Sequence, residues 1–175
     1  MNLDGIDPLD GRYFDAEISK HLSEKTRIIY QARLEGALAS TLADWGICDK
    51  SLADEINKAA KNIDIEKVQK EEETTRHDIK AIVNTIKAEI SDEAKPYVHF
   101  GATSYDIVSN ASALQFKDAI QELVLPRLAE LIETLTGLAD TYKSQPQIGR
   151  THGQHAVPIT FGFALSEYVS RLRLS

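Results

Sequence analysis

The sequence predicts an all-α fold in which a small N-terminal helical domain is followed by the start of a long-helix bundle. Apolar residues recur at steps of three and four along most of the chain, which is the spacing of one helical face. No segment of useful length alternates apolar and polar residues as a half-buried strand does, and the periodic segments are long enough for bundle helices. The composition shifts around Lys95-Pro96, so we expect domains at 1–95 and 96–175, the second one truncated.

The first domain is expected to hold four helices after an irregular start over residues 1–18. A long helix should cover about 19–45 and stop at Gly46, because one face carries Ile28, Ile29, Ala32, Leu38, Leu42 and Trp45. A short helix opens near Ser51, and Asp64 is a suitable cap for a third. Apolar residues then repeat at helical steps over 79–90, which predicts an amphipathic fourth helix.

The second domain should begin with a long helix capped by Thr103 or Ser104. Pro126 forces a kink or a new start, after which the apolar pattern continues to about Tyr142. A polar loop over 149–158 follows, and we expect its proline to start another apolar helix that wants packing partners. That helix stops without a capping signal, so we expect the chain to be a fragment, the alternative being a last helix docked within the domain.

Charge and cysteine content narrow the class of protein. The formal net charge of −7 and the pI near 5.2 argue against a nucleic-acid surface, which needs a basic face. The single cysteine, Cys48, cannot form an intramolecular disulfide and fits a reducing compartment. No apolar run approaches membrane-spanning length, and the N-terminus lacks the basic start of a signal peptide. These features predict a cytoplasmic protein that binds neither nucleic acid nor membrane.

Three polar clusters interrupt the helical pattern. The first, over 74–78, places His77 and Asp78 at a helix start, where they could serve chemistry or simply cap the helix. The second, over 99–106, could form an anion-binding nest, although an ordinary N-cap explains it as well and His99 reads as a packed histidine. The third, over 149–158, offers a glycine beside several polar side chains. The histidines lack the spacing of a metal site, so we expect no metal and no cofactor.

These clusters resemble, in order and chemistry, the fumarase/aspartase superfamily and, within it, the adenylosuccinate lyase family. The resemblance rests on four motifs: Pro8-Leu9-Asp10-Gly11-Arg12-Tyr13, Thr75-Arg76-His77-Asp78, His99-Phe100-Gly101-Ala102-Thr103-Ser104-Tyr105-Asp106 and Arg150-Thr151-His152-Gly153-Gln154. The first two point to the adenylosuccinate lyase branch, and the other two discriminate less between branches. The match runs along essentially the whole chain, whereas a family member is much longer.

The resemblance implies a lyase that eliminates fumarate from adenylosuccinate and from succinyl-aminoimidazole-carboxamide ribotide in purine biosynthesis. It implies that His152 is the proton donor and that His77 is a second catalytic histidine, which helps to bind the substrate and orient the acid. Substrate contacts are implied for Arg12, Tyr13, Arg76, Asp78, Thr103, Ser104, Thr151 and Gln154. The partners would be the purine nucleotide, fumarate and, at full length, three further copies in a homotetramer.

Two departures from the family pattern qualify these expectations. The family's catalytic base resembles a serine on a mobile loop far downstream, and nothing in this chain matches it, so the chain alone should be inactive. His155 stands where relatives often carry a small residue or proline, and we assign it no role. Two alternatives stay open: another lyase or cycloisomerase of the same superfamily, or a non-catalytic helical assembly module whose polar clusters serve as caps.

Overall fold

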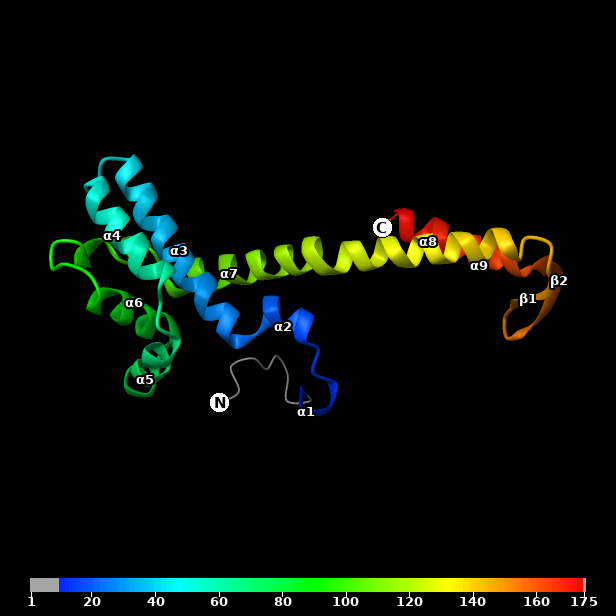
Figure 1. Ribbon diagram of the computed structural model, residues 1–175, viewed down its shortest axis with the longest axis horizontal. Coiled ribbons are helices and arrows are strands. Elements are labelled where there is room, and N and C mark those ends of the chain that lie inside the picture. The colour runs from blue at the N-terminus through cyan, green and yellow to red at the C-terminus, as the bar shows by residue number, and fades with distance from the viewer. Residues whose placement is uncertain (1–9, 175) are drawn as a thin grey trace. The chain divides into compact units, whose positions relative to one another are not determined.

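The computed structural model describes residues 10–174, so Pro8, Leu9 and Ser175 lie outside the described part of the chain. Helices dominate it, which confirms the helical fold class. The chain forms two compact units, one ending at Ala119 and one beginning at Ile120, and each is described separately below (Figure 1). The domain boundary expected near residue 95 stays a prediction.

The long helix expected over 19–45 is divided into two in the first unit. Helix α2 spans Ala16–Leu22 and α3 spans Glu24–Asp44, following a four-residue α1, Asp10–Tyr13. The break falls at Ser23, whose extended backbone lets its hydroxyl accept a hydrogen bond from the Thr26 N–H at 3.3 Å. A serine hydroxyl can replace a helical hydrogen bond by bonding to a nearby backbone group, so serine is favoured at an N-cap over the interior of a helix.

The buried face of α3 differs in part from the expected one. Ile28, Ala32 and Leu42 are buried as expected, but Ile29 is 41% exposed and Trp45 is 80% exposed. The same buried face instead includes two polar residues one turn apart, Gln31 and Glu35, both 0% exposed. Polar side chains at core positions are costly and therefore informative.

Three further helices contribute to the core of the first unit: α4 (Lys50–Lys61), α5 (Ile65–Thr75) and α6 (Asp78–Ala88). As expected, Asp64 caps α5, accepting from the backbone N–H groups of Glu66 and Lys67. The apolar face of α6 forms the centre of the core, with Ile79, Ile82 and Ile86 at most 1% exposed. Helix α3 packs along α4 and also contacts α6, which fixes the start of α6 beside α3 (Figure 1).

A short 3₁₀ turn, η1 (Lys95–Tyr97), leads to α7 (Ser104–Ala119). Helix α7 packs on α2 and α3, and the side-chain amide of Gln115 donates to the carbonyl of His21 at 2.8 Å. The N-terminus of α7 is closed by Asp106, which accepts from the Thr103 N–H at 2.8 Å. An acidic residue three positions after the N-cap commonly serves this purpose.

The second unit begins with a π-helical segment, η2 (Ile120–Val124), followed by α8 (Leu125–Thr141). The kink or new start expected at Pro126 corresponds to the change from π-helix to α-helix, and this proline lies in the first turn of α8. Prolines and π-helical turns are both common causes of irregularity in long helices, and both occur at this point of the chain.

Residues 146–160 form a β-hairpin, so the expected loop over 149–158 and the expected helix start at Pro158 are wrong. Strand β1 spans Pro146–Thr151, strand β2 spans Gln154–Thr160, and the strands are antiparallel. The register shifts by one residue opposite Gly149, where a β-carbon would lie 2.7 Å from the Val157 carbonyl oxygen. This close approach requires glycine.

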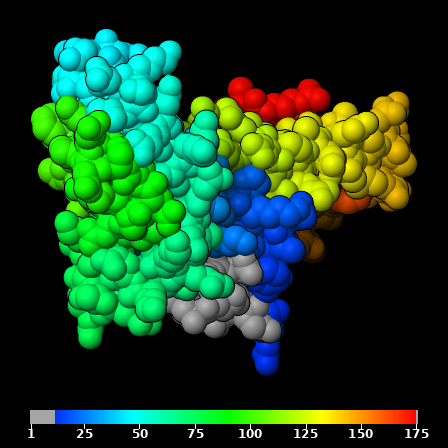
Figure 2. All heavy atoms as spheres, turned by 60° about the vertical axis from the view of Figure 1, so that its left-hand side comes forward, coloured from blue at the N-terminus to red at the C-terminus, as the bar shows by residue number. Residues whose placement is uncertain are grey.

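Helix α9 (Phe161–Leu174) packs against α8, and its atoms lie directly on that helix in the space-filling view (Figure 2). The base of the hairpin is closed by two backbone bonds, from Phe161 N–H to the Gln145 carbonyl at 2.8 Å and from Gly162 N–H to the Tyr142 carbonyl at 3.0 Å. No residue of α8 is buried, and α9 buries only Gly162 and Val169. No described helix is long and apolar enough to span a membrane.

Candidate functional site

Backbone strain marks each of the three polar clusters. Among the described residues, the non-glycine positions with positive φ are Arg76 (54°), His99 (63°) and His152 (51°). Each of the three belongs to a different polar cluster. A side chain in the left-handed region costs about 1–2 kcal/mol, so such residues tend to persist where function needs them. The coincidence favours a functional interpretation of all three segments over a purely capping one.

His77 lies at a sharp connection between two helices. Arg76 ends α5 with its N–H donating to the Glu72 carbonyl at 2.8 Å, and His77 is the N-cap of α6. The Lys80 N–H donates to Nδ1 of His77 at 3.3 Å, which leaves Nε2 as the protonated nitrogen of the neutral ring. The Oγ of Ser104, the first residue of α7, lies 3.3 Å from Nε2.

Nδ1 of His77 has two possible partners, the Lys80 N–H and the carboxylate of Asp78. Nδ1 lies 3.4 Å from Oδ1 of Asp78, a distance that would suit an ion pair with a charged ring. That oxygen already accepts from the Ile79 N–H at 2.8 Å, and Nδ1 cannot accept from Lys80 and donate to Asp78 at once. We therefore assign Nδ1 as an acceptor, so that His77 presents an N–H toward Ser104.

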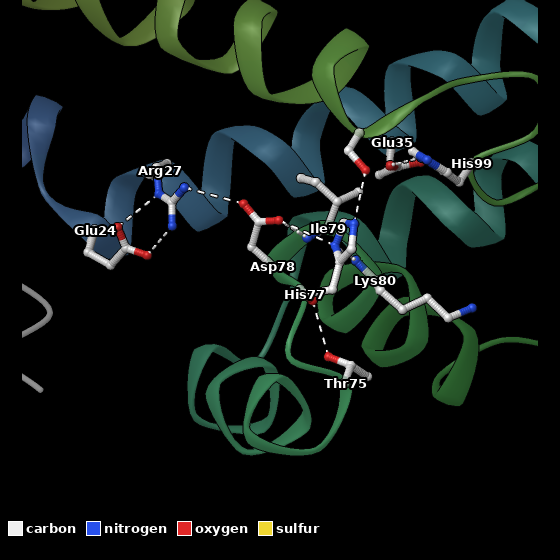
Figure 3. A network of polar contacts seen from close by, with 10 residues as sticks. Glu24, Arg27, Glu35, Thr75, His77, Asp78, Ile79, Lys80 and His99 are labelled. Carbon is white, nitrogen blue, oxygen red and sulfur yellow. Dashed lines mark hydrogen bonds and ion pairs between the residues drawn. The ribbon is translucent and has the colours of Figure 1, made fainter.

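Asp78 ties the start of α6 to α3. Its Oδ2 lies 3.5 Å from Nη1 of Arg27, which is itself paired with Glu24 (Figure 3). The hydrogen bond with Glu24 raises the pKa of Arg27, with Asp78 adding to the effect. Both carboxylate oxygens of Asp78 are thus engaged within the chain, and the expected substrate contact of Asp78 stays a prediction.

A cavity of about 340 Å³ opens beside His77 and Ser104. Two lysines, Lys80 and Lys87, lie in its wall together with His99, and its floor is apolar, formed by Ile79, Val83 and Val98. A small cavity with an apolar floor and a few convergent polar groups is the usual form of a small-molecule site. The two lysines would favour an anionic ligand.

His99 is not simply packed as the sequence suggested, because it contacts a buried acid. Its Nδ1 lies 2.7 Å from Oε1 of Glu35, whose side chain is fully buried (Figure 3). Burial raises the pKa of Glu35, while His99 and, more weakly, Lys87 oppose that rise. Sequence reasoning missed Glu35, although a carboxylate on the same helical face as Ile28 and Ala32 was a readable signal.

The third cluster occupies the tip of the hairpin in the second unit. His152 and Gly153 form a two-residue turn with φ of 51° and 71°, between the paired residues Thr151 and Gln154. This is the geometry of a type I′ turn, in which both central residues need positive φ. All four residues are exposed, so the turn presents His152 outward with its neighbours beside it.

The structure brings together some of the predicted site residues. His77 contacts Ser104, and Thr103 lies at the adjoining start of α7, whereas Arg76 is exposed beside His77. Arg12 and Tyr13 are exposed on α1 and make no hydrogen bond to the cavity residues within the described part of the chain. In the second unit, Thr151, His152 and Gln154 share one turn, and no group of three or more metal-ligating side chains occurs among the described residues.

The chain is similar to known lyases over almost its whole length. Residues 12–174 match a protein family described as lyase. Adenylosuccinate lyase of Methanocaldococcus jannaschii is 36% identical over 169 residues, which is 95% of this chain and 36% of that protein. N-acetyl-S-(2-succino)cysteine lyase of Enterococcus italicus is also 36% identical, over 92% of this chain and 35% of that protein.

Solved structures agree with the sequence relatives. A fumarate lyase from Mesorhizobium sp. BNC1 superposes with a TM-score of 0.81 at 32% identity, covering 95% of this chain and 40% of that one. The β-carboxy-cis,cis-muconate cycloisomerase of Acinetobacter calcoaceticus sp. ADP1 gives 0.78 at 29% identity, with the same coverage. The chain therefore spans about two fifths or less of the length of the proteins it matches.

Proposed function

This chain belongs to the lyase family of the fumarase/aspartase superfamily, and from that membership we propose that it is the N-terminal portion of an adenylosuccinate lyase. The complete enzyme would eliminate fumarate from adenylosuccinate and from succinyl-aminoimidazole-carboxamide ribotide. We place it in the cytoplasm, where an unpaired thiol such as Cys48 stays reduced. The proposal extends the family assignment to one substrate class.

One observation carries the proposal: the strained residues of the described chain fall in the three clusters that carry the chemistry-bearing side chains. A module that needed only caps and turns would be expected to carry glycine at Arg76, His99 and His152, because glycine adopts the left-handed backbone at lower cost. Two of the strained residues adjoin the segments that bring His77 and Ser104 into contact at the edge of a cavity, where they could bind a substrate.

The proposed reaction needs a base and an acid. A base removes a proton from the carbon next to a carboxylate, and the resulting carbanion is delocalised onto that carboxylate. Its electron pair then forms the double bond of fumarate as the carbon–nitrogen bond breaks, and an acid protonates the leaving nitrogen. We assign the acid to His152, whose exposed position on a tight turn lets it reach a substrate, and we place the base in the part of the enzyme beyond this chain.

The remaining residues would bind the substrate. Ser104 and Thr103, at the start of α7, can donate to a succinyl carboxylate, and His77 offers its N–H at the same edge of the cavity. Lys80 and Lys87 add positive charge suited to an anionic substrate. Arg12 and Tyr13 are proposed to contact the nucleotide phosphate, for which the arginine fork is well suited.

We further propose that the complete enzyme is a homotetramer built around the helices of the second unit. Helices α8 and α9 leave large apolar side chains exposed, among them Leu125, Leu131, Leu138, Phe163 and Tyr168. Many large exposed apolar side chains on two packed helices are typical of an interface. In the proposed tetramer, these apolar side chains would be buried against partner subunits.

The test is to assay fumarate release from adenylosuccinate by the full-length protein, followed as an ultraviolet absorbance change. His152→Asn should abolish turnover while leaving the hairpin intact, because asparagine accepts the backbone of a type I′ turn. His155→Asn, in β2 of the same hairpin, is the control and should stay active. If the His152→Asn variant were active, His152 could not be the acid.

A second candidate is favoured by the equally similar N-acetyl-S-(2-succino)cysteine lyase, which points to another succinyl substrate. Turnover of a succinylated thiol or of carboxymuconate, with none of adenylosuccinate, would establish that candidate. A non-catalytic assembly module would turn over none of these. Its melting temperature would also not move on adding AMP and fumarate, whereas binding raises the melting temperature of a site-bearing protein.

A further inference from the structure

The core of the first unit contains a polar group that the proposed mechanism does not use. Glu35 and Gln31 lie one turn apart on α3, and both are 0% exposed. Oε2 of Glu35 and both amide atoms of Gln31 are buried without a hydrogen-bond partner in the described chain. Burying polar groups in this state is costly, and an apolar residue of similar volume is often as stable or more stable at such a position.

Glu35 bonds to His99, a residue that lines the cavity. Oε1 lies 2.7 Å from Nδ1 of His99, whose side chain is 22% exposed and lines the cavity with His77 and Ser104. His99 is also the residue at which the chain adopts φ of 63° on its way from η1 to α7. The bend directly precedes the segment that places Ser104 3.3 Å from His77.

We propose that Glu35 is a positioning residue that acts through His99. Its carboxylate accepts the Nδ1–H of His99, which fixes the ring orientation and the left-handed bend and leaves Nε2 as the ring nitrogen free to meet a ligand in the cavity. The bend in turn sets the start of α7, and with it the distance between Ser104 and His77. This inference rests on the proposed function only in taking the cavity to bind the substrate.

The arrangement resembles the acid–histidine pairs that orient an imidazole in other sites, where the acid sets the tautomer and does not touch the substrate. Burial raises the pKa of Glu35, and His99 and Lys87 are the groups that oppose this rise. Val98 anchors the other side of the bend, because it is 3% exposed in the same core. Rotation of His99 therefore has little freedom once Glu35 holds Nδ1.

Two variants of the full-length enzyme separate positioning from packing. Glu35→Gln keeps an acceptor for Nδ1–H and should retain most of the wild-type kcat/KM. Glu35→Leu removes the acceptor while improving apolar burial, so its melting temperature should equal or exceed that of wild type, while kcat/KM falls by about 10- to 100-fold. The matched control is Gln31→Leu, one turn away and equally buried, which should leave kcat/KM unchanged.

The spectroscopic readout is independent of the substrate. Long-range ¹H–¹⁵N spectra of the histidine rings should show His99 protonated at Nδ1 in the wild type, Glu35→Gln and Gln31→Leu, and not fixed there in Glu35→Leu. An unchanged His99 signature in Glu35→Leu would overturn the inference, as would full activity of that variant. Loss of activity in Glu35→Gln with the His99 tautomer retained would overturn it too. If the wild type fails to act on adenylosuccinate, the proposed function fails, while the spectra still test Glu35.

Discussion

At the scale of single residues, left-handed backbone occurs at two connections that lead into helices and at one hairpin turn. Arg76, His99 and His152 each occupy a backbone region that glycine adopts more easily. At the two helix starts, residues of the proposed site also take part in capping. His77 is the N-cap of α6, and the Thr103 N–H donates to Asp106 at the start of α7. The same few residues therefore set both local structure and the proposed site.

Asp106 gives a pH-dependent prediction at this scale. Its hydrogen bond from the Thr103 N–H lowers its pKa below the ordinary value of 3.8. Because the pKa is lowered on folding, the bond stabilises the start of α7 above pH 3.8 and this contribution is lost as the pH falls through the lowered pKa. Asp106→Asn should therefore melt below wild type at neutral pH, and the gap should close in strong acid.

Melting curves of both proteins, followed by helical circular dichroism over the acid range, would check this. Asp92→Asn is a useful comparison, because Asp92 has a lowered pKa caused by Lys95 and lies outside the start of α7. A gap between wild type and Asp106→Asn that is the same at neutral and acid pH would contradict the proposed role of the carboxylate.

At the scale of elements, much of the helical structure follows from the sequence. The three-and-four spacing of apolar residues predicted α6, and Asp64 predicted the start of α5. Pro126 predicted a kink or a new start where α8 begins. The hairpin could not be predicted in this way. Both of its strands are largely exposed, so no buried face imposes an apolar–polar alternation, and Pro158 imitates a helix start.

Two glycines of the second unit give a paired prediction. A β-carbon on Gly162 would lie 2.3 Å from the Ala139 carbonyl oxygen, where α9 approaches α8, whereas one on Gly137 would meet nothing within 4 Å. Gly162→Ala should destabilise the helix pair by about 1–3 kcal/mol because backbone must move apart. Gly137→Ala should stabilise it by up to about 1 kcal/mol through helix propensity.

Urea unfolding of this chain, monitored by helical circular dichroism, measures both variants. Amide exchange of α8 and α9 then locates the change. Equal effects of the two substitutions would show that the close approach at Gly162 does not control the packing of this helix pair.

At the scale of the whole molecule, the two units differ in how much they bury. The first unit has a continuous apolar core built on α3 and α6, whereas α8 contributes no buried residue to the second. The sequence indicated this imbalance only through its last apolar helix, which was expected to need packing partners. Motifs in the sequence also predicted His77, Ser104 and His152 as site residues. The position of Glu35 on a buried helical face could be inferred from the sequence, but its contact with His99, 64 positions away, could not.

The imbalance predicts uneven stability. In this chain, amides of α8 and α9 should exchange faster with solvent than those of α3 and α6, because fewer apolar contacts resist their opening. In the full-length protein the difference should shrink as partner surfaces cover the exposed side chains. Hydrogen exchange measured by mass spectrometry on both proteins tests this, and equal protection of the four helices in this chain would contradict it.

The closed base of the hairpin has an evolutionary consequence. The chain leaves α8 after Thr141, and the Phe161 N–H bonds back to the Gln145 carbonyl at the base of the hairpin. Thr160, the last residue of β2, accepts from the Phe163 N–H at 3.1 Å at the start of α9, so only changes confined to the tip, residues 151–154, leave these ties in place. Insertions, deletions or substitutions there change the reach and surroundings of His152 without altering the path of α8 or α9. Such a segment can diverge quickly while its scaffold stays constant, which offers one fold a short route to new substrates.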